Sequence, residues 1–187
     1  GGLVFAVNRD VLIPRPETEI LVETGLRYAL GCKAQAAGLK ILDLGTGSGC
    51  IAITLAKFLP EALVSATDIS PLALKVARRN AEFYQVKVEF LESDLFSIYQ
   101  LRTSAEGGAA CGVTNYQLII SNPPYIGSDQ IQKLQPELQY EPRVSLDGGE
   151  DGLDFYRRII AQAGGFLSRE GLLIMEIGFD QSQKIKE

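Results

Sequence analysis

The stretch Lys40-Ile-Leu-Asp-Leu-Gly-Thr-Gly-Ser-Gly49 decides the fold of this chain. It runs from an apolar strand directly into a glycine-rich turn, and apolar residues then recur at helical spacing from Ile51 to Leu59. Glycines in such a turn can adopt positive φ and let the backbone approach a ligand closely. The helix that follows offers free N–H groups to a carboxylate or a phosphate. The stretch therefore predicts a strand, a ligand-binding turn and a helix in succession.

A second strand-like segment, Leu63–Thr67, ends at Asp68. Asp68 follows the glycines at roughly the distance at which an acidic residue binds two ribose hydroxyls. The alternative is that Asp68 helps to cap the next helix, which Ser70 as N-cap and Pro71 as first helical residue indicate. Cys50 stands where a dinucleotide-type turn would have its third glycine, so a nicotinamide or flavin dinucleotide is disfavoured.

A third strand is predicted from Val86 to Leu91, and the acidic and apolar run up to Phe96 follows it. In this run Asp94 can accept a hydrogen bond from an adenine amino group, and Leu95 or Phe96 can cover the ring. The alternative is a solvated carboxylate beside a core aromatic, because aromatic residues are buried in either case.

After an apolar fourth strand comes Asn122-Pro-Pro-Tyr125, which can hold a planar, uncharged NH2 group. Such a nitrogen needs acceptors for its two N–H groups, which the Asn122 side chain and the Asn–Pro backbone carbonyl can supply. Tyr125 offers a stacking face, and Pro123 and Pro124 stiffen the backbone that aims the carbonyls. The alternative is an ordinary turn after a buried strand.

Strands and helices alternate along the chain, which predicts an α/β fold with a mostly parallel, doubly wound sheet. In such a sheet, ligands lie beyond the carboxyl ends of the strands at the switch point. A nucleoside bound along strands one to three would present its reactive end to the Asn-Pro-Pro-Tyr run, which fits S-adenosylmethionine giving a methyl group to nitrogen. Further predictions are helices at 16–30 and 153–166, a fifth strand at 172–177, a flexible insertion at 97–115 and a long functional loop at 127–152.

Composition narrows the function mainly by exclusion. The chain has 187 residues and 46% hydrophobic residues, which fits one domain with a real core. It has no histidine, so Ser-His-Asp and Cys-His catalysis and His-ligated metal sites are excluded. The three cysteines are far apart, so neither a metal site nor a disulfide framework is expected, and a reducing, cytoplasmic location is favoured. The net charge of −5 disfavours direct nucleic-acid binding, and the apolar runs are too short to span a bilayer.

These motifs resemble those of the release factor glutamine methyltransferases, the HemK/PrmC family of protein-(glutamine-N5) methyltransferases. Asn-Pro-Pro-Tyr alone is shared with DNA adenine and other amino methyltransferases, whereas the leading Ile13-Pro-Arg-Pro-Glu-Thr-Glu19 is far more selective. The resemblance covers nearly the whole chain, in the segments 5–19, 42–49, 68–70, 121–126, 141–153 and 176–178.

The resemblance implies a Rossmann-like class I fold and methyl transfer from S-adenosylmethionine to the glutamine of the Gly-Gly-Gln motif in peptide chain release factors. It implies that Arg15 and Glu17 border the active site, although that pair is equally typical of a helix start. Asn122, Pro123, Pro124 and Tyr125 would hold the glutamine. By position it assigns the donor site to Gly45, Thr46, Gly47, Ser48, Gly49, Asp68 and Leu95, to which the strand-end argument adds Asp94 and, facing the donor group, Asn122.

Two departures from the family pattern give rise to further expectations. The family's N-terminal helical domain and its final strands after the fifth are both expected to be missing. The chain is therefore expected to be a single catalytic domain over 1–187, with the leading motif and helix in 1–38 and the Rossmann-like core in 39–187. Two alternatives stay open, namely a nucleic-acid amino methyltransferase acting on adenine N6 or guanine N2, and an inactive remnant that only binds the donor.

Overall fold

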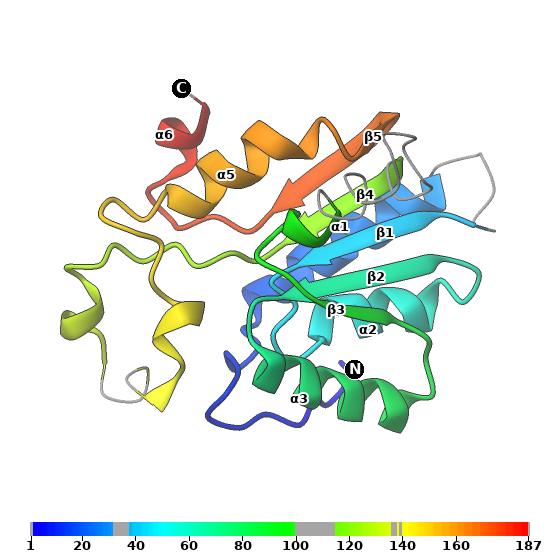
Figure 1. Ribbon diagram of the computed structural model, residues 1–187, viewed down its shortest axis with the longest axis horizontal. Coiled ribbons are helices and arrows are strands. Elements are labelled where there is room, and N and C mark those ends of the chain that lie inside the picture. The colour runs from blue at the N-terminus through cyan, green and yellow to red at the C-terminus, as the bar shows by residue number, and fades with distance from the viewer. Residues whose placement is uncertain (1, 32–37, 100–114, 136–137, 139, 187) are drawn as a thin grey trace.

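The computed structural model describes residues 2–31, 38–99, 115–135, 138 and 140–186 (Figure 1). Within these ranges a five-stranded sheet forms the centre of the molecule, and every neighbouring pair of its strands is parallel. Their order across the sheet is β3-β2-β1-β4-β5. The bounds are β1 (Lys40–Leu44), β2 (Leu63–Asp68), β3 (Glu89–Glu92), β4 (Tyr116–Ser121) and β5 (Leu167–Met175).

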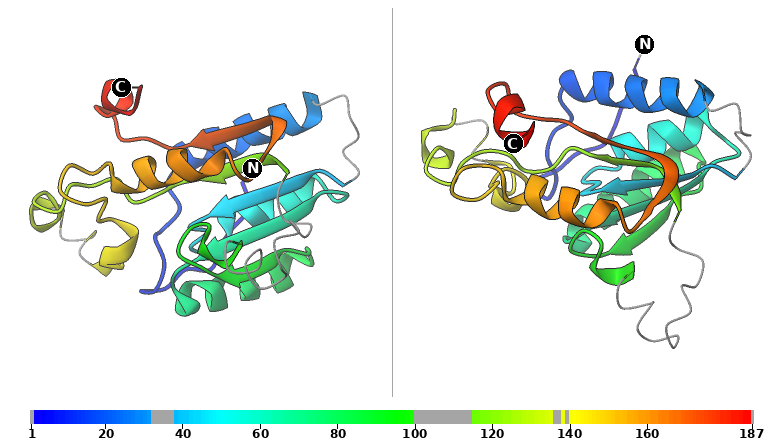
Figure 2. Two further views of the ribbon diagram at one scale, coloured as in Figure 1. Left: turned by 45° about the horizontal axis from the view of Figure 1, so that its top comes forward. Right: turned by 90° about the horizontal axis from the view of Figure 1, so that it is seen from above.

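Helices lie on both faces of this sheet. Figure 2 shows α1 (Glu17–Gly31) and α5 (Asp154–Ala163) on opposite sides. The helix α2 (Cys50–Phe58) packs beside α1, and α3 (Pro71–Tyr84) packs beside α2 and against β2 and β3. Two short 3-10 helices, η1 (Ile131–Lys133) and η3 (Arg143–Ser145), lie in the loop after β4, and α6 (Ser182–Lys186) follows β5.

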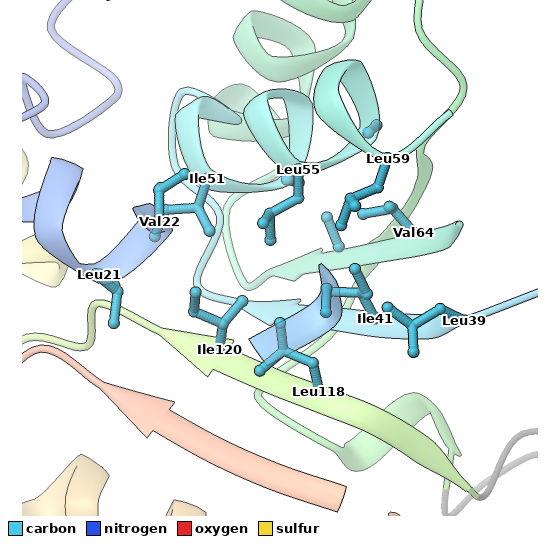
Figure 3. Close-up of a cluster of buried hydrophobic side chains, with 14 residues drawn as sticks. Leu21, Val22, Leu39, Ile41, Ile51, Leu55, Leu59, Val64, Leu118 and Ile120 are labelled. Carbon is cyan, nitrogen blue, oxygen red and sulfur yellow. The ribbon is translucent and has the colours of Figure 1, made fainter. Parts of the chain in front are cut away.

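Successive residues of the central strands supply two separate cores, because side chains alternate between the faces of a strand. Ile41, Leu118 and Ile120 face α1 and α2, where they meet residues such as Leu21 and Leu55 (Figure 3). The intervening residues face α5 instead, and this second core contains Leu42, Leu44, Ile119, Ile159 and Phe166. Burial on both faces explains why these strands are apolar throughout rather than alternating.

The chain order puts a switch point between β1 and β4. From β1 the chain builds outward through β2 to β3, and then returns to place β4 on the other side of β1. In doubly wound sheets the crevice at this point is where ligands bind. The turns after β1 and β4 are the two that carry the glycines and the Asn-Pro-Pro-Tyr run, so the topology brings the two motifs to one edge of the sheet.

The predicted helices and strands are found, although several of their bounds differ; for example, α5 ends at Ala163 rather than at residue 166, and β5 ends at Met175 rather than at residue 177. The third strand begins at Glu89 rather than Val86, because Gln85 ends α3 in a left-handed conformation and the Val86 N–H still bonds to the Ala81 carbonyl. The fifth strand extends back to Leu167, and its pairing with β4 shifts register at Tyr116 and Leu118. Most of the insertion predicted at 97–115 lies outside the described residues.

Candidate functional site

A pocket opens at the carboxyl ends of the strands, between the turn after β1, the ends of β2 and β3, and the run after β4. The leading segment closes one side through Val11, Leu12 and Pro14. Gly49 and Tyr125 are predicted site residues that do not line it. The predicted residues that do line it are Gly45, Thr46, Gly47, Ser48, Asp68, Asp94, Leu95, Asn122, Pro123 and Pro124.

The glycine turn needs its glycines for different reasons. Gly45 and Gly47 have φ of 71° and 55°, and a Cβ at either would meet no heavy atom within 4 Å. Their backbone thus borders open space on the pocket side, where a ligand can approach. Gly49 has φ of 83°, but a Cβ there would lie 2.7 Å from Ile53 Cδ1 and 3.1 Å from Ala77 Cβ. Gly49 therefore serves the close packing of α2 on α3 rather than the pocket.

The buried carboxylate of Asp43 supports this turn through hydrogen bonds. Asp43 Oδ2 accepts hydrogen bonds from Thr46 Oγ1 at 2.6 Å and from the Ala52 N–H at 3.2 Å, whereas the buried Asp43 Oδ1 has no partner among the described residues. Burial raises the pKa of Asp43 to about 7. Sequence reasoning missed this role, although a charged residue inside an apolar strand was a visible signal.

Asp68 joins the glycine turn to the start of α3. Its Oδ2 accepts from the Gly47 N–H and its Oδ1 from the Ser70 N–H, both at 2.8 Å. The cap of α3 is Ser70 itself, whose Oγ accepts from the Ala73 N–H at 3.2 Å. Burial raises the pKa of Asp68, and its backbone hydrogen bonds oppose that rise. The carboxylate therefore stands at the pocket wall with its orientation fixed from two sides.

Asp94, Leu95 and Phe96, which come shortly after β3, divide between the pocket and the core. Leu95 adopts φ of 50° and lines the pocket, as does Asp94. Phe96 is fully buried and stacks on Phe166, with ring centroids 4.5 Å apart. Of the two aromatic roles left open by the sequence, the core one is correct for Phe96. Asp94 Oδ2 is also bound by Arg158 Nη2 of α5 at 2.6 Å, a partner that sequence reasoning missed because it comes 64 residues later.

Asn122 stands beside the pocket with its amide already engaged. Asn122 Nδ2 donates to Thr18 Oγ1 at 3.2 Å, and Thr18 Oγ1 donates to Glu176 Oε2 at 2.9 Å. Just before it, Ser121 Oγ donates to the Leu44 carbonyl at 2.8 Å and ties the run to the end of β1. The sequence alone assigned no role to Thr18 or Glu176, because their connection to Asn122 depends on the tertiary structure.

Tyr125 is half-buried and is held mainly through its backbone. Gln181 Nε2 donates to the Tyr125 carbonyl at 2.9 Å. A Cβ at Gly148 would lie 2.8 Å from Tyr125 Cα, and one at Gly152 would overlap the Tyr125 carbonyl oxygen. The turn that carries these glycines therefore packs against the Asn-Pro-Pro-Tyr run. Burial raises the pKa of the Tyr125 hydroxyl, and the neighbouring Glu176 and Glu17 carboxylates raise it further.

The leading motif reaches the same region. Arg15 forms an ion pair with Glu141, whose side chain is buried in the loop after β4, and this pair ties the entry to α1 to that loop. Glu17 begins α1 and is exposed. Arg15 and Glu17 therefore lie at the start of α1, and neither is among the residues that line the pocket.

Neither a group of metal-ligating side chains nor a membrane-spanning helix is found in the described part of the chain. No three His, Cys, Asp or Glu side chains of the described residues are grouped as metal ligands would be. Within the same ranges, no helix combines the length and apolar character needed to cross a membrane.

Comparisons with known proteins agree with this arrangement. Residues 22–138 match the family model described as methyltransferase small domain. The protein named release factor glutamine methyltransferase from Geobacter sulfurreducens is 44% identical over 98% of this chain and 59% of its own length. The protein of that name from Thermodesulfovibrio yellowstonii is 45% identical over 99% of this chain and 62% of its own length. The expected resemblance to the release factor glutamine methyltransferases is thus confirmed. The chain spans about three fifths of the length of these relatives.

Solved structures agree on the fold. A methyltransferase from Pyrococcus furiosus superposes with a TM-score of 0.65 at 20% identity, over 97% of this chain and 74% of that one. A ribosomal protein L11 methylase from Lactobacillus delbrueckii superposes with a TM-score of 0.55 at 20% identity, over 92% of this chain and 66% of that one. The expectation of a Rossmann-like, class I methyltransferase fold with a parallel sheet is confirmed.

Proposed function

The chain belongs to the methyltransferase small domain family, and we propose that it methylates the side-chain amide nitrogen of a glutamine in peptide chain release factors. The methyl donor is S-adenosylmethionine, and the acceptor is the glutamine N5 in the Gly-Gly-Gln motif. The observation that carries the proposal is that Asn122 lines the same pocket as the glycine turn, Asp68 and Leu95. The relatives named release factor glutamine methyltransferase support the choice of protein substrate.

The donor end of the pocket suits a nucleoside with an amino-acid tail. Open space beside Gly45 and Gly47 leaves room for a ligand against the backbone, and the start of α2 offers N–H groups to a carboxylate. Asp68 can accept hydrogen bonds from ribose hydroxyls, and Asp94 can accept one from an adenine amino group. Leu95 supplies an apolar surface for the base.

The acceptor end suits a carboxamide. The Asn122 side-chain oxygen and the backbone carbonyl of the Asn122–Pro123 bond can accept from the two N–H groups of the substrate amide. These acceptors stabilise the positive charge that grows on the nitrogen during attack more than they stabilise the ground state. Pro123 and Pro124 keep the carbonyls aimed, so little reorganisation is needed when the substrate binds.

The chemistry then requires alignment more than acid–base catalysis. S-adenosylmethionine supplies a methyl group on a sulfonium, which is already a strong electrophile. The amide nitrogen forms the new N–C bond as the C–S bond breaks, and the electron pair of that bond leaves on sulfur. The protonated amide finally gives its extra proton to water. Holding the nitrogen in line with the donor can contribute several kcal/mol.

A nucleic-acid amino methyltransferase is the second candidate, because Asn-Pro-Pro-Tyr serves that chemistry equally well. The net charge of −5 disfavours it. The arginines near the pocket are also neutralised, since Arg143 pairs with Asp147 at 3.0 Å and Arg158 with Asp94 at 2.6 Å. No observation favours this candidate over the protein substrate.

The test is to incubate the protein with tritiated S-adenosylmethionine and separately with a release factor, a ribosomal protein and DNA. We expect label only in the release factor, at the glutamine of its Gly-Gly-Gln motif. Label in DNA would favour the second candidate. Donor binding by calorimetry without transfer to any acceptor would identify an inactive remnant.

The Asn122→Ala variant tests the acceptor site itself. Because it removes an acceptor that acts mainly in the transition state, we expect turnover to fall by about a hundredfold or more, with a smaller loss of donor affinity. Turnover comparable to that of the unmodified protein would count decisively against this role for Asn122.

A further inference from the structure

The side chains of Asn122, Thr18 and Glu176 come from distant parts of the chain and form a hydrogen-bonded relay. Thr18, in the first turn of α1, accepts from Asn122 Nδ2 at 3.2 Å and donates to Glu176 Oε2 at 2.9 Å. The Asn122 amide and the Tyr125 hydroxyl lie close to the Glu176 carboxylate and lower its pKa. We propose, resting on the function proposed above, that Glu176 is a positioning residue that turns the Asn122 side-chain oxygen toward the substrate and so selects a neutral carboxamide.

The relay fixes which end of the Asn122 amide faces the pocket. An asparagine amide has a donor end and an acceptor end, and an ionised carboxylate can only accept. Glu176 and the Thr18 hydroxyl that it orients therefore hold Asn122 Nδ2 on their own side. Among the described residues, none donates a hydrogen bond to Asn122 Oδ1. This oxygen remains available to accept from an N–H group of a ligand in the pocket.

Glu176 is itself held in place through its backbone. Its N–H donates to the Ser121 carbonyl at 3.0 Å, and its carbonyl accepts from Tyr156 Oη at 3.1 Å. Ser121 pairs with Met175 in the parallel register of β4 and β5. The residues that follow this pair, Asn122 and Glu176, consequently leave the sheet side by side. A rigid sheet edge thus sets the geometry of the relay.

The charge of Glu176 adds a second source of selectivity. Burial raises the pKa of Glu176, the adjacent polar groups of Thr18, Asn122 and Tyr125 oppose that rise, and the nearby Glu17 carboxylate adds to it. Arg15, whose positive charge lowers the pKa of Tyr125, is already paired with Glu141. Excess negative charge here disfavours an anionic side chain such as glutamate. It favours a neutral amide whose nitrogen becomes positive in the transition state.

The first test is a double-mutant cycle on methyl transfer to a release factor. Thr18→Val and Glu176→Leu each break the relay, and we expect either to lower kcat about tenfold or more while donor Kd stays within about twofold. Thr18→Ser keeps the hydroxyl and is expected to restore kcat. In an Asn122→Ala background the further effect of Glu176→Leu should disappear, because Glu176 acts through Asn122. Additive losses would overturn the proposal.

A second measurement does not depend on activity. The Asn122 side-chain NH2 signal in NMR spectra, identified by its loss in Asn122→Ala, should be shifted and protected from exchange in the unmodified protein. We expect this protection to be lost in Thr18→Val and in Glu176→Leu, and kept in the control Thr24→Val, whose hydroxyl bonds only to the Ile20 carbonyl of the same helix.

The two measurements separate the two proposals. An unresponsive Asn122 amide signal refutes the relay whatever the protein methylates. A responsive signal in a protein that labels no release factor refutes the proposed function and leaves the relay standing. Thermal unfolding of each variant checks that the fold survives, and the Thr18 pair of variants gives the answer if Glu176→Leu fails to fold.

Discussion

Asp94 and Arg158 join the end of β3 to α5 across the pocket, with Asp94 Oδ2 2.6 Å from Arg158 Nη2. Both side chains line the pocket, and they are 41% and 42% exposed, so their ion pair contributes at most about 1 kcal/mol to stability. Its effect is instead to orient the carboxylate, because one oxygen is bound by Arg158 and the other is left for a ligand.

This relationship predicts a binding phenotype for Arg158→Ala. Without its partner the Asp94 carboxylate is free to rotate, so we expect the Kd for S-adenosylmethionine to rise about three- to tenfold in calorimetry, with unfolding free energy nearly unchanged. Arg157→Ala is the matched control, since Arg157 precedes it on the same helix but pairs with Asp151 and Asp154 outside this pocket. Equal losses in the two variants would show that the pair does not orient the carboxylate.

The glycine turn predicts opposite phenotypes for two glycines that are two residues apart. In Gly47→Ala the new methyl group meets open space, so we expect a stability loss of about 1 kcal/mol from the left-handed backbone but at least a tenfold loss of donor affinity. In Gly49→Ala the methyl group collides with Ile53 and Ala77, so we expect a loss of about 2–4 kcal/mol in urea unfolding. A Gly47→Ala protein with normal donor affinity would remove the turn from the binding site.

The close contact between Gly152 and Tyr125 predicts a catalytic defect without a binding defect. A methyl group at Gly152, where φ is 75°, overlaps the Tyr125 carbonyl oxygen, so Gly152→Ala must displace the Asn-Pro-Pro-Tyr run. We expect kcat to fall at least about tenfold and donor Kd to change less than about twofold. Gly164→Ala, where a Cβ would meet nothing within 4 Å, is the control and should leave kcat unaltered. Normal turnover by Gly152→Ala would mean that the run tolerates this displacement.

Asp43 predicts how stability depends on pH. Its folded-state pKa, raised by burial from 3.8 to about 7, means that the folded protein binds this proton more tightly than the unfolded chain does. The contribution of this group is therefore fully present below about pH 4 and is lost as pH rises through about 7. We expect the free energy of unfolding to fall between pH 5 and 8, with Asp43 accounting for on the order of 2 kcal/mol.

The comparison with Asp43→Asn isolates this contribution. Asp68 and Glu176 also have raised pKa values and add pH dependence of the same sign, whereas the lowered pKa of the partly buried Asp147 acts at more acidic pH. We expect Asp43→Asn to have a shallower slope between pH 5 and 8 in urea unfolding at a series of pH values. Identical slopes would show that Asp43 is ionised in the folded protein throughout this range.

Much of the fold could be read from local sequence because local forces determine it. Apolar residues buried on both faces of a strand, a serine before Pro71 and glycines with positive φ act on their immediate neighbours, so they leave a signal in a short window. The error at Val86 has the same origin. Its apolar character favoured a strand, but the closing hydrogen bond to Ala81 at the end of α3 prevailed.

The chain by itself determined the doubly wound sheet, the glycine turn and the Asn-Pro-Pro-Tyr run, since each is a pattern of adjacent residues. Only the tertiary structure decided that Thr18 and Glu176 meet at Asn122, that Arg158 holds Asp94, and that Gly152 packs against Tyr125. The physical reason is that parallel strands bring their carboxyl ends to one edge, and helices and loops pack around that edge, so residues as far apart as 158 positions become neighbours.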